Sequence, residues 1–505
     1  MSSKEFLTVE EVVEYLDVLS DDELSEYELC QLPPEEDHRL TDEEDVNEND
    51  LGEIIPADTC GKISLTLPNR DDDGEKEKHS LPRRKGVKQK SSTMGKGNVW
   101  KKLNQFEKEI PSEPMRGLDN HREELVALEP IELFFKYLPQ QYLSHVANMS
   151  SLYAQQKGSS LDVTWEETAQ FFGILLFSGY HTVPQENLYW CSAEDMSIPI
   201  IPSVMPRNRF KDIKRYFHLS DNNMLQKGDK LGKISPLYRE LGKNVVQFGI
   251  FHKELSLDES MVPYYGYNSS KMLIKGKPIR FGYKIWMLCS SSGYPYAMQI
   301  YAGKENNSTG PLGSRVVCDL LAVVEHPKQI ELYFDNFFSS HSLLAELADR
   351  SIKATGTIRE GRIAKCPLKP TKVIAKSHRG DFDFLCDGVV FFCRWNDNSV
   401  VTLGSNCYTT EPLGSVKRFS RKEGKRIEIT QPQLIKKYNL GMGGVDVLDK
   451  LLASYNSSVG LFGAVQLLSP CMYDLYDRAD DNYGIEAPVP SSTHFGFPLT
   501  VATTY

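Results

Sequence analysis

The sequence of 505 residues predicts an α/β protein that follows a long N-terminal tail. Between Glu254 and Ile358 the hydrophobic pattern gives three short strands and then alternating helices and strands. Hydrophobic residues make up 40% and charged residues 25%, which is ordinary globular usage and excludes collagen, coiled coil and wholesale disorder. The longest apolar run, Phe171 to Phe177, is far shorter than the about 20 residues that span a bilayer, so we expect no membrane partner.

The order of these elements predicts a ribonuclease-H-like core over residues 250–360. Three strands joined by hairpin-type turns are followed by two helical crossovers, which requires a mixed sheet covered by helices. The expected strands are Glu254–Leu257, Phe281–Leu288, Tyr294–Tyr301, Ile330–Phe334 and Ile352–Ile358, and the expected helices are Leu312–Val324 and Ser339–Arg350.

Residues 128–245 are predicted to form a helical region for dimerisation or DNA binding, so a homodimer is one assembly that we consider. Pro139 divides the segment 130–152 into two short helices, and Thr164 with Glu167 forms a capping box ahead of an apolar run. Residues 206–219 read as an amphipathic basic helix, which is either a solvated surface helix or one that faces DNA.

Beyond the core, residues 361–437 are predicted to form a β-rich insertion. Short β segments with Asp-Gly and Asn-Asp turns occur between Asp381 and Thr402, and helical spacing returns after Pro432. We assign residues 438–452 to a late helix of the core and residues 453–505 to a divergent C-terminus.

Charge is distributed very unevenly along the chain, although the net charge is only −11. Residues 1–60 hold 21 acidic and 2 basic residues, and residues 61–110 hold 13 basic and 7 acidic residues. We expect residues 1–110 to be disordered, apart from a short helix over residues 6–19 that could order on a nuclear protein partner of the acidic tail. The remaining body is almost neutral, so the acidic pI of 5.6 does not argue against a nucleic-acid partner.

A basic run in the tail has three readings: a nuclear import signal, a phosphate-binding arm or a solvated linker. Import is the one that we favour, which predicts a nuclear protein. The cationic residues of the run are Arg83, Arg84, Lys85, Lys88 and Lys90. The ten cysteines include no CxxC pair, so we expect reduced thiols and no zinc.

Four aspartates could hold a metal ion. Asp258 follows the first predicted strand and Asp335 the fourth, and the carboxyl ends of neighbouring strands meet at one edge of an α/β sheet. Asp446 and Asp449 lie three residues apart and share a helix face. Taken singly, each is more often a turn residue or a helix cap, but together their hard oxygens suit Mg²⁺ or Mn²⁺ in phosphoryl transfer.

Six strings of the sequence, in this order, resemble piggyBac transposases and the domesticated piggyBac transposable element-derived proteins. The resemblance extends over residues 130–452. The strings are MPRNRFKDIKRYFHLSDN (205–222), SLDESMVPYYG (256–266), KGKPIRFGYKIWMLC (275–289), LYFDNFFSSHSLL (332–344), KATGTIRE (353–360) and YNLGMGGVDVLD (438–449).

The resemblance implies a ribonuclease-H-like domain with an insertion, and DNA hairpin cleavage with strand transfer at TTAA targets. It implies a catalytic DDD triad of Asp258, Asp335 and Asp446, with Asp449 beside the third, as the Mg²⁺ ligands. Residues 451–505 depart from the family pattern, because they contain one basic residue, no Trp and a single Cys. Since the family usually continues with a basic, Trp-rich segment and a zinc-binding domain, the C-terminus is expected to be divergent or truncated.

Three hypotheses for function follow from these observations. The first is a nuclear, transposase-derived protein that binds double-stranded DNA and has weak or no cleavage activity. The second is an active Mg²⁺-dependent transposase, and the third is an interaction protein that acts through its acidic tail. The DNA contacts are expected at Arg207, Arg209, Lys211, Lys214, Arg215, Lys275, Lys277, Arg280, Lys417, Arg418, Arg421, Lys422, Lys425 and Arg426.

Overall fold

The computed structural model divides the chain into two units. One unit comprises Met1–Asn98 with Gly266–Phe281, and the other comprises Val99–Tyr265 with Gly282–Tyr505. Within them the structure describes residues 2–6, 28–31, 63–67, 99–114, 128–247, 252–263, 272–273, 281–303, 310–420 and 424–454.

The first unit contains three short strands from the N-terminal tail. They form an antiparallel sheet in the order β1-β3-β2, with β3 (Ile63–Leu67) between β1 (Ser2–Phe6) and β2 (Glu28–Gln31). The same unit includes the two-residue strand β5 (Met272–Leu273). These strands lie within the region expected to be disordered; apart from Phe6, the helix expected over residues 6–19 lies outside the described residues.

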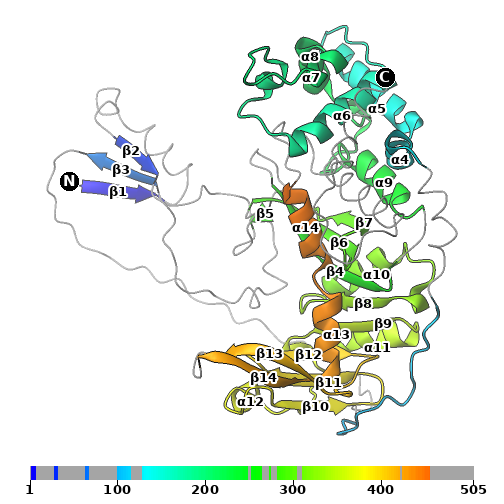
Figure 1. The fold of residues 1–505 in the computed structure, drawn as a ribbon, viewed down its shortest axis with the longest axis vertical. Coiled ribbons are helices and arrows are strands. Elements are labelled where there is room, and N and C mark those ends of the chain that lie inside the picture. Colours follow the sequence, from blue (N-terminus) through cyan, green and yellow to red (C-terminus); the bar gives the residue numbers. More distant parts are fainter. Residues whose placement is uncertain are drawn as a thin grey trace. The chain divides into compact units, whose positions relative to one another are not determined.

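The second unit is built on a large mixed sheet, as the sequence predicts (Figure 1). Its strands follow in the order β10-β11-β12-β9-β8-β4-β6-β7. β8 lies parallel to both β4 and β9, whereas β6 pairs antiparallel with β4 and with β7. The strands are β4 (Glu254–Pro263), β6 (Phe281–Ser290), β7 (Pro295–Ile300), β8 (Glu331–Phe334), β9 (Lys353–Thr357), β10 (Phe382–Cys386), β11 (Phe391–Asn396) and β12 (Val400–Ser405).

The three strands predicted inside the insertion continue the core sheet. β12 pairs antiparallel with β9, with Ser405 opposite Thr355, and β11 and β10 follow outward. A two-stranded hairpin, β13 (Gly414–Ser420) with β14 (Lys425–Gln431), completes this region. Sequence periodicity identifies these strands but contains no information on the edge to which they attach.

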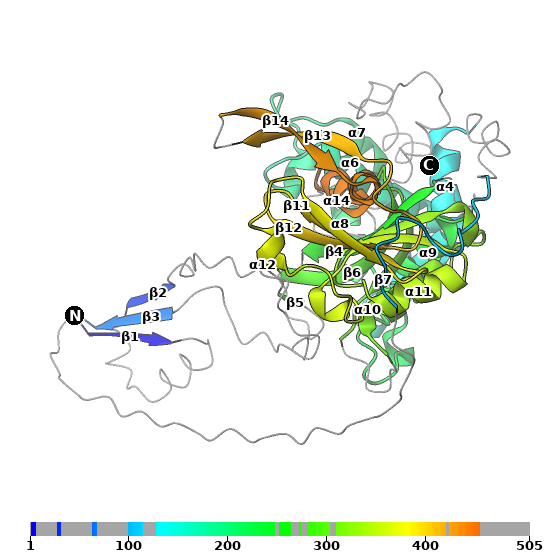
Figure 2. The same cartoon turned by 90° about the horizontal axis from the view of Figure 1, so that it is seen from below.

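Helices cover both faces of the sheet (Figure 2). α11 (His341–Asp349) packs on β9 and β12, and α10 (Leu312–Leu321) packs on β7. On the opposite face, α13 (Gln433–Gly441) packs on β8, β9 and β12, while α14 (Gly444–Ser454) packs on β4. The alternation of β6 agrees with this division, because Met287 joins a core cluster with Leu448 of α14 while Trp286 stacks on Phe337.

The helical region lies beyond the β7 end of the sheet (Figure 1). The capping box predicted at Thr164 and Glu167 begins α6. No helix among the described residues is long and apolar enough to cross a membrane. The helices are α4 (Pro130–Tyr137), α5 (Gln140–Gln156), α6 (Trp165–Tyr180), α7 (Ile200–Val204), α8 (Arg207–Tyr216) and α9 (Ser235–Asn244), and a further short helix, α12 (Thr371–Ile374), lies in the insertion.

Residues 99–114 form an arm that lies against the outer strands of the sheet, although the sequence predicted disorder as far as residue 110. Lys101 and Cys386 of β10 exchange two backbone hydrogen bonds, of 2.8 and 2.9 Å. The ring of Trp100 packs on Phe392 at 5.5 Å between centroids, and Asn104 accepts two hydrogen bonds from Thr410. The arm therefore satisfies part of a sheet edge that would otherwise be open.

Gly444 allows α14 to lie directly on the sheet. A Cβ atom at this position would come 2.0 Å from the carbonyl oxygen of Ser290 and 2.6 Å from the Oγ of Ser256. Val445 and Leu448 then pack with Ile285, Met287 and Cys289 of β6. The placement of the third predicted aspartate thus depends on a position that accepts only hydrogen as its side chain.

We expect Gly444→Ala to loosen α14, because backbone at Ser290 must move to admit a methyl group. The cost should be about 1–3 kcal/mol, as for other insertions into tightly packed regions. Thermal unfolding and hydrogen exchange of residues 444–454 measure it. Gly361→Ala is the matched control, since its Cβ would meet no atom within 4 Å. Equal exchange rates in α14 of both variants would contradict this account.

Candidate functional site

Asp258 and Asp335 lie side by side on neighbouring parallel strands. β4 and β8 pair with Leu257 opposite Phe334, so these two aspartates are the next residues along each strand. Asp258 does not follow its strand, as the sequence suggested, but lies within it, because β4 continues to pair with β6 as far as Pro263. It marks instead the point at which the parallel pairing with β8 ends.

Local hydrogen bonds fix both carboxylates. The Oδ1 atom of Asp258 accepts a hydrogen bond from the backbone amide of Glu259, and the Oδ1 atom of Asp335 accepts one from the amide of Phe337. Both bonds are 2.8 Å long. Burial and the negative charge of Glu259 raise the pKa of Asp335, which the Phe337 amide and the charges of Lys284 and Arg359 only partly offset. A cation beside Asp335 would therefore be favourable.

The two aspartates of α14 have different environments. The Oδ1 of Asp449 accepts a 2.5 Å hydrogen bond from the Oγ of Ser260, which lies two residues beyond Asp258 on the same face of β4. Asp446 is exposed. Both aspartates lie on one helix, as predicted, but the helix expected over residues 438–452 is divided, because residues 438–441 belong to α13 and α14 begins at Gly444. Asp449 holds α14 to β4.

Tyr438 of α13 lies among three of the carboxylates, and the sequence reasoning did not single it out. Burial raises the pKa of the Tyr438 hydroxyl; a hydrogen bond with Thr357 opposes the rise, and the charges of Asp335, Asp258 and Asp446 add to it. Thr357 ends β9, one residue beyond the pair Phe334–Gly356, so it continues the row of Asp258 and Asp335. The sequence did contain a signal that could have identified Tyr438, because it is the first residue of the string YNLGMGGVDVLD.

Oxygen donors of this kind suit Mg²⁺ or Mn²⁺, and Asp258 and Asp335 are close enough in register to share an ion. Within the part of the chain that the structure describes, however, no three His, Cys, Asp or Glu side chains lie close enough to hold one ion together. The pair on the sheet thus supplies two carboxylates that suit such an ion.

Comparisons with known proteins agree with this architecture. The family model described as Transposase IS4 matches residues 129–463, about two thirds of the chain. The human PiggyBac transposable element-derived protein 3 is 38% identical over 336 residues, covering 65% of this chain and 57% of that protein. The chain belongs to the piggyBac transposase family.

Two further relatives show the extent of the family likeness. The human PiggyBac transposable element-derived protein 2 is 34% identical over 350 residues, covering 68% of this chain and 59% of that protein, so the chain spans less than two thirds of either curated relative. A piggyBac transposase solved in a synaptic complex with hairpin DNA aligns with a TM-score of 0.61 and 21% identity, over 75% of this chain and 81% of that chain. At that identity the match indicates a shared fold.

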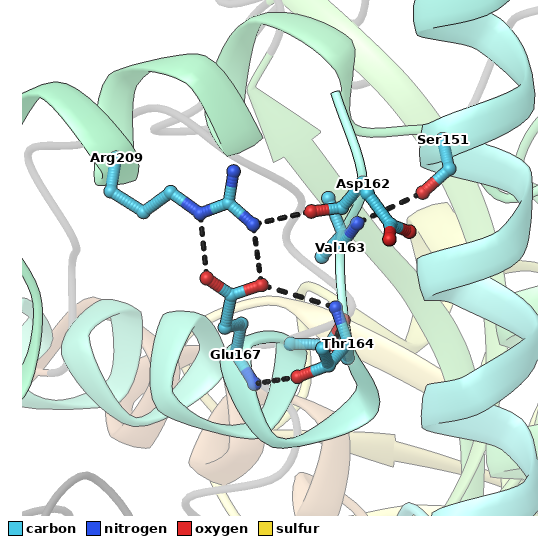
Figure 3. A network of polar contacts seen from close by, with 7 residues as sticks. Ser151, Asp162, Val163, Thr164, Glu167 and Arg209 are labelled. Carbon is cyan, nitrogen blue, oxygen red and sulfur yellow. Dashed lines mark hydrogen bonds and ion pairs between the residues drawn. The ribbon is translucent and has the colours of Figure 1, made fainter. Parts of the chain in front are cut away.

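Arg209 of α8, a predicted DNA contact of this piggyBac family member, holds the start of α6 in place. Its guanidinium donates from Nε and Nη2 to the two oxygens of Glu167, each at 2.6 Å, and also to the carbonyl of Asp162 (Figure 3). Glu167 is at the same time the capping-box residue whose carboxylate accepts from the amide of Thr164. Lys214 is similarly paired with Glu186, whereas Arg207 and Arg215 are exposed and Lys211 is half-exposed.

The predicted cations of the insertion also divide into two groups. Arg418 pairs with Asp397 at 3.1 Å, whereas Lys417, Lys425 and Arg426 are exposed on the β13–β14 hairpin. Several predicted residues lie outside the described part of the chain: Lys275, Lys277, Arg280, Arg421 and Lys422 among the DNA contacts, and Arg83, Arg84, Lys85, Lys88 and Lys90 of the import run.

We expect Arg209→Ala to lower stability rather than act mainly on DNA. The change leaves Glu167 and the Asp162 carbonyl without a charged donor, which should cost about 1–3 kcal/mol. Arg215→Ala is the matched control on the same helix; it should change stability by less than about 0.5 kcal/mol. Thermal unfolding distinguishes the two variants, and equal melting temperatures would contradict the structural role of Arg209.

The ion pair also predicts a dependence of stability on pH. Burial alone would raise the pKa of Glu167, but the hydrogen bonds from Arg209 and Thr164 lower it below its ordinary value of 4.5. The folded state then binds fewer protons than the unfolded state, so the stabilisation is complete above pH 4.5 and is lost as the pH falls through the lowered pKa. The free-energy difference between wild type and Glu167→Gln should shrink in that window, and a constant difference would count against the assignment.

Proposed function

We propose that this member of the piggyBac family is a nuclear, transposase-derived protein that binds double-stranded DNA and has weak or no cleavage and strand-transfer activity. The observation that carries the proposal is the state of the carboxylate row. Asp258 and Asp335 are adjacent, whereas Asp446 is exposed and Asp449 is bound to Ser260. DNA cleavage by metal ions requires tightly held ligands, and the described residues include no three carboxylates close enough to hold one ion.

The arrangement of strands supports a ribonuclease-H-like origin for the core. The series β7-β6-β4-β8-β9 consists of three antiparallel-linked strands followed by two parallel strands that return through α10 and α11. Asp258 and Asp335 stand where ligands of α/β sheets gather, at the carboxyl end of the parallel strands. When bound, Mg²⁺ or Mn²⁺ would activate an attacking oxygen and stabilise a leaving oxygen, and these two aspartates would hold it.

Exposed cations at two places support DNA binding. Arg207 and Arg215 lie on α8, and Lys417 and Arg426 lie on the β13–β14 hairpin. Since such side chains contact phosphates, they provide affinity that depends on salt and reads little sequence. The solved relative is described as a complex with hairpin DNA, which is consistent with a DNA partner for this chain.

An active enzyme is the second candidate, favoured by the environment of Asp335. Burial beside Glu259 makes its negative charge unfavourable in the absence of a cation. Asp446 acts with the same two aspartates on the hydroxyl of Tyr438, so an active enzyme would need Asp446 to turn towards the pair. The two candidates share the DNA surface and differ in whether Asp446 joins Asp258 and Asp335 at a metal ion.

Binding and cleavage are tested on the full chain with a terminal-repeat duplex. We expect affinity to fall steeply with salt, and the double variant Arg207→Ala, Arg215→Ala to reduce the salt slope by about 1 per lost phosphate contact. Arg239→Ala with Lys243→Ala, two exposed cations of α9, is the matched control. Absence of salt-dependent binding would refute the proposal.

Incubation of the same complex with Mg²⁺ or Mn²⁺ decides between the two candidates. We expect no nicked or hairpin products above background. Products that disappear in Asp258→Ala would replace the proposed function with that of an active transposase.

A further inference from the structure

The outer face of the β13–β14 hairpin presents an aromatic ring to solvent. Phe419 is 59% exposed, and no other phenylalanine, tyrosine or tryptophan among the described side chains is exposed. Residues directly opposite each other in an antiparallel pair share a face, so Phe419 lies beside Arg426, and Lys417 beside Glu428 on the same face. The ring is thus flanked by cations on both strands.

The hairpin holds this ring outward. On the inner face, Val416 and Ile427 pack against the core cluster around Trp395 and Leu434. The backbone carbonyl of Phe419 accepts a 3.0 Å hydrogen bond from Arg379. Since the backbone is anchored and the inner face is occupied, Phe419 cannot turn inward without breaking these contacts.

A shared carboxylate strengthens the anchor. Asp397 binds Arg379 at 2.6 Å and Arg418 at 3.1 Å, so one acidic group joins the loop before β10 to the strand that bears Phe419. Leaving more than half of a Phe side chain in water forgoes much of the free energy that its burial would provide. An aromatic side chain held exposed in this way is suited to contact a partner.

The charge of the hairpin indicates an anionic partner. Residues 414–431 contain six basic residues and two acidic ones. A flat ring between Lys417 and Arg426 matches the chemistry of a nucleotide, in which an aromatic base adjoins a phosphate. Stacking of a base on an aromatic side chain is worth about 1–3 kcal/mol and occurs with every base.

We propose that Phe419 stacks on an unpaired base of a single-stranded DNA segment while Lys417 and Arg426 contact the adjoining phosphates. The inference rests on the proposed DNA binding and adds the structural form of the DNA to it. Insertion of the ring into intact duplex would require unstacking of a base step, which costs a few kcal/mol and is not offset by one ring. An unpaired base needs no such unstacking, so it is the better ligand.

The full chain is tested by fluorescence anisotropy against a blunt duplex and the same duplex with a single-stranded extension. The wild type should bind the extended DNA more tightly. Phe419→Ala should weaken binding to the extended DNA by about 5- to 150-fold, the equivalent of one stacking contact, and leave binding to the blunt duplex unchanged. Phe419→Trp should retain the preference, and Val373→Ala, at a residue that is 53% exposed on α12, is the matched control.

A fluorescent base analogue in the extension gives a direct readout of stacking. Its emission should change on binding the wild type but not on binding Phe419→Ala. Equal loss of affinity for both DNAs would overturn the inference, because it would indicate a general effect on the hairpin. The inference would also be overturned if Phe419→Ala bound both DNAs as tightly as the wild type does, whether or not its oligomeric mass differed.

The two proposals fail in different ways. If Phe419→Ala binds the extended DNA as the wild type does, this inference fails and the proposed DNA binding stands. If the wild type binds neither DNA, the proposed function is refuted and this inference with it.

Discussion

The parallel pairing of β4 with β8 is the constraint on which the candidate site depends. Its register sets Asp258 beside Asp335, although the two residues are 77 positions apart in the chain. On the other side of β4 the antiparallel ladder with β6 continues to Pro263. At Asp258, therefore, β4 loses its partner β8 but keeps its partner β6. The chain leaves β8 at Asp335, whose carboxylate accepts a hydrogen bond from the amide of Phe337. One register thus aligns the two carboxylates at the point where the parallel pairing ends.

The late helices complete this edge through close approaches that larger side chains would prevent. Gly441 at the end of α13 lies against the ring of Tyr333, and Gly444 at the start of α14 lies on the carbonyl of Ser290. Three residues before Gly441, Tyr438 reaches the row formed by Asp258, Asp335 and Thr357, where its hydroxyl hydrogen-bonds with Thr357. The sheet fixes Asp258 and Asp335, whereas the position of Asp446 depends on how α14 lies on β4.

Local signals in the sequence predicted elements well, and non-local contacts explain what they missed. The capping box at Thr164 and Glu167, the helix break at Pro139 and the strands of the sheet were predicted because each depends on neighbours in the chain. The same Glu167 is also the partner of Arg209, 42 residues away, and no local pattern reveals that this cation is engaged. The arm of residues 99–114 was likewise predicted as part of the tail, because its contact with the sheet, such as that of Trp100 with Phe392, is not local in sequence.

The carboxylate edge of the sheet and the cationic surfaces of α8 and of the β13–β14 hairpin differ in electrostatic character. Asp258, Asp335, Asp446 and Asp449 gather negative charge at one edge, and the pKa of Asp335 is already raised by burial and by Glu259. A phosphate would be repelled there unless a cation came between them. Lys284 offsets this only in part, since its ammonium group also lies 3.7 Å from the carboxylate of Glu259. The exposed cations of α8 and of the β13–β14 hairpin lie on other elements, so the positive charge that would attract a phosphate is separate from the carboxylate edge.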